Sequence, residues 1–106
     1  MKKETVRAFT GAIKEIVPIT RYQGKAFAIG NDPKWVLVVE IKSVEKEPQQ
    51  RKEGENQIAY AIHSPVKLLG IPAEKAKGRV FKFEESKLFA DDGKDAGRDL
   101  VASPKD

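Results

Sequence analysis

The chain offers few side chains for acid–base or nucleophilic chemistry. His63 is the only histidine among 106 residues, and there is no cysteine. Ser64 follows His63 directly, but neighbouring residues of a strand point to opposite faces, so we expect no Ser–His dyad. His63 is expected to bond to nearby backbone or to contribute to a ligand site. The sequence therefore predicts a protein that is not an enzyme, with carboxylate-only chemistry left open.

The carboxylates give no clear site either. Glu40 stands in an otherwise apolar segment, but Lys42 shares its face two residues on, which predicts an exposed charge pair. The run 91–95 (DDGKD) lacks the glycine and glutamate spacing of a calcium loop. Glycines stand singly, without a phosphate-binding motif. We expect no metal and no cofactor.

The net charge of +4 is unevenly distributed along the chain. Residues 1–82 carry +7 and residues 83–106 carry −3. An excess of this size on the first part of the chain could attract an anionic partner, although an ordinary lysine-rich surface explains it as well.

Strand-length apolar segments dominate the pattern, and no long window has helical periodicity. Five strands are expected, at Val6–Val17, Tyr22–Ile29, Trp35–Val44, Gln57–Ile62 and Arg79–Glu85. Gly11 predicts a bulge in the first strand. Ser64 as N-cap, Pro65 after it and Gly70 as the stop predict a one-turn helix, and residues 72–78 could add a second turn.

Length and composition predict one domain. Residues 1–90 are expected to form it, and residues 91–106 a polar tail that is partly disordered unless Leu100 and Val101 add an edge strand. The polar stretch 45–56 predicts a long loop. No apolar run approaches the ~20 residues of a membrane helix, so we expect no membrane partner. Charged residues interrupt the N-terminal stretch where a signal peptide would be apolar, so a cytoplasmic protein is expected.

The fold class expected is all-β, a small five- or six-stranded barrel with one short helix. At Ile58–Pro65 (IAYAIHSP) and Leu68–Gly70 the chain resembles OB-fold-like small β-barrel domains, and it is similar to small bacterial proteins of unassigned function. The resemblance covers about residues 5–86. It departs from the OB order because the loop at 45–56 stands where the family has its helix, so another small barrel stays open.

The resemblance implies binding of single-stranded nucleic acid, by bases stacked on aromatic rings in a basic groove. Tyr22 is the best candidate for an exposed stacking ring, and Phe27 and Phe81 are further aromatic candidates. The expected ligand-binding residues are Lys14, Arg21, Tyr22, Lys25, Lys42, His63, Lys67, Arg79 and Lys82.

The alternative is a protein-interaction or assembly module. Val36 and Val38, with Ala59 and Ala61, form a second apolar face that either a second copy or the chain's own helix and tail could cover. An open barrel would also have edge strands able to pair with another chain.

Overall fold

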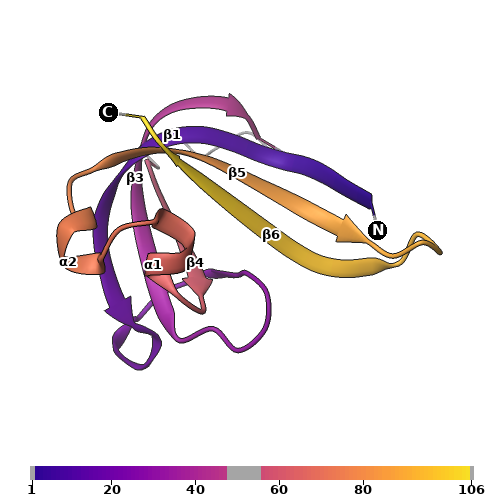
Figure 1. The fold of residues 1–106 in the computed structure, drawn as a ribbon, viewed down its shortest axis with the longest axis horizontal. Helices are drawn as coiled ribbons and strands as arrows, with labels where there is room; N and C mark the ends of the chain where they lie inside the picture. Colours follow the sequence, from indigo (N-terminus) through magenta and orange to yellow (C-terminus); the bar gives the residue numbers. More distant parts are fainter. Residues whose placement is uncertain (1, 48–55, 106) are drawn as a thin grey trace.

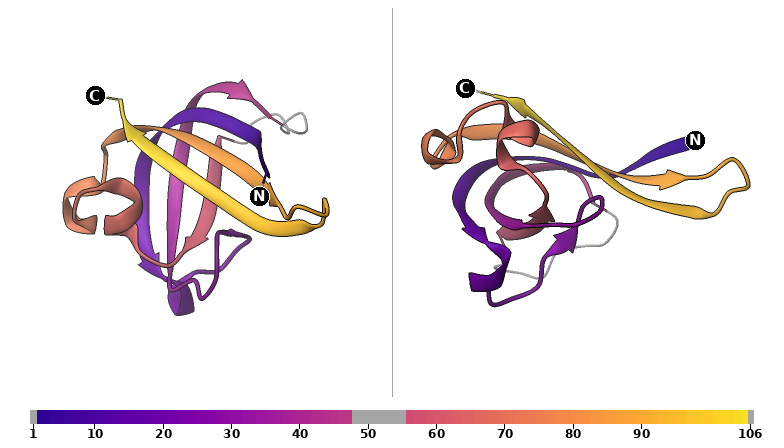
Figure 2. Two further views of the ribbon diagram at one scale, coloured as in Figure 1. Left: turned by 45° about the vertical axis from the view of Figure 1, so that its right-hand side comes forward. Right: turned by 60° about the horizontal axis from the view of Figure 1, so that its bottom comes forward.

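The fold is a six-stranded sheet that curls into a half-barrel, with two short helices at one side (Figures 1 and 2). The computed structural model describes residues 2–47 and 56–105. Most of the polar loop expected at 45–56 therefore lies outside the described residues. The predicted all-β, barrel-like class is confirmed, with a second short helix in addition to the expected one.

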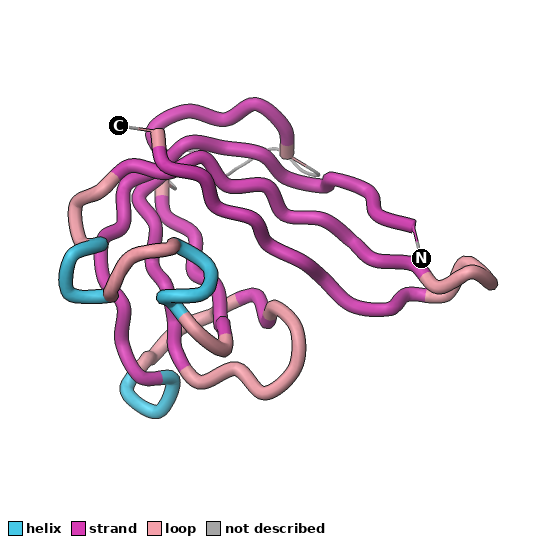
Figure 3. Tube along the Cα trace, in the orientation of Figure 1, coloured by secondary structure: helices cyan, strands magenta, loops and turns pink. Residues whose placement is uncertain are grey.

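The strand order in the sheet is β2-β4-β3-β1-β5-β6. All neighbours are antiparallel except β2 and β4, which are parallel. Helical residues are confined to short segments between strands (Figure 3). The elements are β1 (Lys2–Pro18), the 3-10 turn η1 (Ile19–Arg21), β2 (Phe27–Ala28), β3 (Trp35–Lys46), β4 (Gln57–Ile62), α1 (Pro65–Leu69), α2 (Ala73–Ala76), β5 (Val80–Phe89) and β6 (Asp95–Pro104).

One core fills the inner face of the curl. Alternate residues of the strands point inward, and the rings of Phe9 and Phe83 stack with centroids 5.2 Å apart. Leu69 of α1 and Ala76 of α2 close the core on the helical side. The buried residues are Phe9, Ile13, Leu37, Val39, Tyr60, Ile62, Leu69, Ala76, Phe81, Phe83 and Leu100.

The first helix forms as its sequence predicts. The Ser64 hydroxyl accepts a hydrogen bond from the Lys67 amide at 3.3 Å, and Pro65 occupies the first turn. Gly70 ends the helix in the left-handed conformation, with φ 77°. The helix is short because these start and stop signals stand only six residues apart.

Residues 95–104 contain the edge strand that Leu100 and Val101 left open, and the strand is longer than expected. They form β6, a ten-residue strand paired along β5, and Leu100 is 5% exposed in the core. The Ala90 amide donates to the Lys94 carbonyl oxygen at 2.8 Å where the hairpin closes, and within the turn the Lys94 amide donates to the Asp92 carboxylate at 3.0 Å. Composition underestimates this segment because an edge strand with one buried residue needs little apolar content.

The second expected strand is also shorter than its pattern suggests. Only Phe27–Ala28 pairs with β4, while Tyr22 and Ala26 fold over the outer face of the sheet. They pack there on the second apolar cluster, which consists of Val36, Val38, Ala59 and Ala61. The chain itself therefore covers this face, with the segment before β2 and not with the helices or the tail.

Gly11 lies where β1 passes close to β3. An added Cβ would stand 2.5 Å from Val39 Cγ1 and 2.7 Å from the Glu40 carbonyl oxygen. The register against β3 shifts between Thr10 and Gly11. The predicted bulge is confirmed, and close approach of the two backbones explains the glycine.

The substitution Gly11→Ala should lower the free energy of unfolding by about 1–3 kcal/mol, because Val39 and the β3 backbone must move. Urea denaturation followed by circular dichroism measures this loss. An unchanged midpoint would contradict the close approach of β1 and β3.

A buried carboxylate joins four strands at the open side of the curl. Glu85 of β5 is 0% exposed. Arg7 of β1 donates to its Oε1 at 2.5 Å, and the Tyr60 hydroxyl of β4 donates to the same oxygen at 2.7 Å. Arg98 of β6 donates to Oε2. Both carboxylate oxygens are thereby satisfied, as a buried charge requires.

The network also reaches β2 through an aromatic ring. The guanidinium carbons of Arg7 and Arg98 lie 4.9 and 5.7 Å from the centroid of the Phe27 ring. Burial lowers the pKa of Arg7, but the charge of Glu85 and the interactions with Tyr60 and Glu85 together outweigh burial, so the pKa is raised overall. Burial and the same charge raise the pKa of Tyr60, so its hydroxyl stays a donor.

We expect Glu85→Gln to lower the free energy of unfolding by about 3–5 kcal/mol, because two arginines then face a neutral amide in a buried site. The matched control is Glu84→Gln at the exposed neighbouring position, whose effect should stay within about 0.5 kcal/mol. Chemical denaturation of both variants measures the difference. Equal losses would contradict a stabilising role for the network.

Candidate binding site

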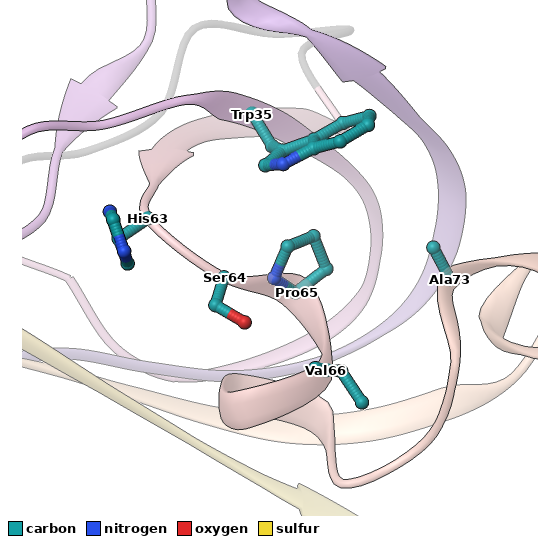
Figure 4. A pocket seen from close by; sticks show the side chains of 6 residues that line it. All are labelled: Trp35, His63, Ser64, Pro65, Val66 and Ala73. Carbon is teal, nitrogen blue, oxygen red and sulfur yellow. The ribbon is translucent and has the colours of Figure 1, made fainter.

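Two pockets flank the junction between β4 and α1. The first, here the aromatic pocket, has a volume of about 240 Å³. Figure 4 shows the indole of Trp35 across the pocket from Pro65, with His63 at one side. Its lining residues are Trp35, His63, Ser64, Pro65, Val66 and Ala73.

Trp35 is 37% exposed although alternation places it on the core side of β3. It is the first residue of that strand, and it pairs with Ile62 at the last position of β4. At this end of the curl the inner face is covered only in part. Trp35 therefore presents ring surface to solvent.

The second pocket, here the aliphatic pocket, has a volume of about 260 Å³. Its apolar lining comes from the segment after β2, from β4, from α1 and from β6. His63 and Ser64 line both pockets, so the two lie on either side of one short stretch of backbone. The residues of the aliphatic pocket are Ile29, Ile62, His63, Ser64, Lys67, Leu68 and Leu100.

The His63 ring is oriented by the bend before β3. Its Nδ1 lies 3.0 Å from the backbone oxygen of Asp32, and a carbonyl can only accept, so Nδ1 carries the hydrogen. In the neutral ring Nε2 is then an acceptor. The hydroxyl of Ser64 caps α1, so the adjacent pair does not form a nucleophile and base.

The other expected binding residues lie apart from this junction. Lys14, Lys42 and Lys82 are on the outer side of β1, β3 and β5. Lys82 lies 3.3 Å from Glu45, and Lys42 lies 2.7 Å from Glu40, whose pKa it lowers by a hydrogen bond and by its charge. The expected charge pair on β3 is confirmed.

The remaining candidates occupy two further places. Arg21 and Lys25 are exposed on the segment between β1 and β2, and Arg79 is exposed just before β5. Of the nine expected residues, His63 and Lys67 are those that line a common pocket. Arg21 and Lys25 lie close to Tyr22, whose hydroxyl donates to the backbone oxygen of Lys25 at 3.4 Å, whereas the other basic residues are on other elements.

The aromatic candidates are also placed differently from the expectation. Tyr22 is half-buried against the second apolar cluster, and Phe81 is buried in the core. Phe27 is 41% exposed but lies beside two arginines. Trp35, which the strand pattern assigned to the core, is the exposed ring beside a pocket. The one feature of the sequence that could have predicted the exposure of Trp35 is its position as the first residue of a strand.

Comparison with protein-family models, curated proteins and solved structures finds no match for this chain. Within residues 2–47 and 56–105, no three histidine or carboxylate side chains gather as metal ligands would. Nor does any helix in these ranges have the length and apolar content to cross a membrane.

Proposed function

We propose that this protein is a non-catalytic module that binds single-stranded nucleic acid, with one base stacked on Trp35. The proposal includes an OB-like architecture and a cytoplasmic location. One observation carries it: an exposed indole lines a pocket whose wall, His63 and Ser64, also borders a pocket holding a lysine. Aromatic rings next to cations are how single strands are commonly held.

The size of the pockets supports a polymer ligand held residue by residue. Volumes of about 240 and 260 Å³ lie below the ~300–1,000 Å³ of pockets for drug-sized molecules. Each pocket is therefore of a size that suits one planar ring. Stacking of one base on an aromatic side chain contributes about 1–3 kcal/mol.

The charge around the junction supports an anionic ligand. Lys67 is exposed at the aliphatic pocket, and no carboxylate among the described residues pairs with its ammonium. Lys34 precedes Trp35 and lies 3.5 Å from Asp32, so its charge is partly neutralised. Lys67 is therefore the cation that we expect to meet a phosphate.

Trp35 is the only tryptophan, so its fluorescence reports directly on the site. We expect a short oligothymidylate to quench this emission saturably, and the affinity to fall steeply with added salt. Trp35→Ala should weaken binding of a fluorescently labelled oligonucleotide by about 5- to 150-fold, measured by anisotropy.

Two lysine variants separate local from general electrostatics. Lys67→Gln should reduce the salt dependence, whereas Lys94→Gln, at the far turn between β5 and β6 (Figure 1), should leave the affinity nearly unchanged. Absence of binding at tens of micromolar protein in low salt, or equal binding by Trp35→Ala, would refute the proposal.

A second candidate function is assembly through a strand edge. β6 pairs with β5 along one side, and no described residue pairs with the backbone of its other side. Free edges of this length can take up another strand. Size exclusion followed by light scattering tests this candidate. If assembly through β6 is correct, we expect a dimer that persists in high salt. A strict monomer at high micromolar concentration would exclude a homo-oligomer.

A further inference from the structure

The two pockets share one wall, and we propose that they are consecutive base sites, so that the smallest specific ligand is a dinucleotide. This inference rests on the proposed nucleic-acid binding. His63 and Ser64 line both pockets, and Lys67 borders the second. A chain that places one ring in each pocket must cross the backbone at 63–64.

The two sites hold a ring by different contacts. The aromatic pocket offers the face of the Trp35 indole, on which a base stacks. The aliphatic pocket offers Ile29, Leu68 and Leu100, which bury the edges or faces of a ring without stacking. The first site therefore anchors the ligand and the second extends it.

The positive charge of Lys67 favours a ligand whose two bases are joined by an anionic group. A phosphodiester carries one negative charge between two bases, and Lys67 lines the aliphatic pocket together with His63 and Ser64, the two residues that both pockets share. The nearby carboxylate of Asp32 lies on the Nδ1 side of His63, 4.0 Å from that nitrogen. A peptide, whose links are neutral, would leave Lys67 unused.

The test compares thymidine monophosphate, the dinucleotide TpT and its neutral methylphosphonate analogue, each titrated against Trp35 fluorescence. We expect TpT to bind about tenfold more tightly than the monophosphate, and the neutral analogue to lose most of that gain. The tighter binding of TpT would not result from negative charge alone, because thymidine monophosphate is also an anion.

Two variants assign the gain to the second pocket. Leu68→Phe should fill the aliphatic pocket and bring the affinity for TpT down to that for the monophosphate. Lys67→Gln should bring TpT and its neutral analogue to similar affinities. Circular dichroism and the denaturation midpoint of each variant verify that it is folded.

The outcomes separate this inference from the proposed function. If longer oligothymidylates quench Trp35 but TpT binds no more tightly than the monophosphate, the two-site inference is wrong and nucleic-acid binding stands. An equal TpT gain in Leu68→Phe would also refute it. If no oligonucleotide of any length binds, both proposals fail.

Discussion

The position of the strands depends on one buried carboxylate. A charged group without solvent must be satisfied by protein donors, and Glu85 finds them on three different strands, in Arg7, Tyr60 and Arg98. Shifting any of these strands by one residue would turn its donor to the other face of the sheet. The network therefore helps to fix the register of β1, β4, β5 and β6 relative to one another.

The same constraint accounts for the place of the candidate site. β2 and β6 are the two edges of the sheet, and Phe27 of β2 meets Arg98 of β6 by ring and guanidinium contact. Two residues further along each segment, Ile29 and Leu100 line the aliphatic pocket. The edge strands β2 and β6 are thus joined by the side chains of Phe27 and Arg98. Two residues further along, they leave the aliphatic pocket between them. A continuous backbone ladder between them would have left no such opening.

Local signals in the sequence predicted local structure well. The bounds of β4 and α1 followed from alternation and from Ser64, Pro65 and Gly70, which act on their immediate neighbours. The bulge at Gly11 was predicted for the same reason, because a glycine in a strand pattern indicates close approach.

Features that depend on distant segments could not be predicted in this way. Glu85 looked like the end of an ordinary strand, since its donors come from positions up to 78 residues away. Tyr22 was expected to be exposed because nothing in its own segment shows that Val36 and Val38 need covering. Trp35 was assigned to the core because alternation gives the face of a residue and not how far along the barrel that face is covered.

The strands β1, β5 and β6 extend beyond the curled part of the sheet as a three-stranded arm, formed by the start of β1, the end of β5 and the start of β6 (Figures 1 and 2). The arm meets the barrel at the register shift between Thr5 and Arg7, where Arg7 binds Glu85. Arg98 of the arm contacts both the Glu85 carboxylate and the Phe27 ring, so these side chains join the arm to the edge strand β2.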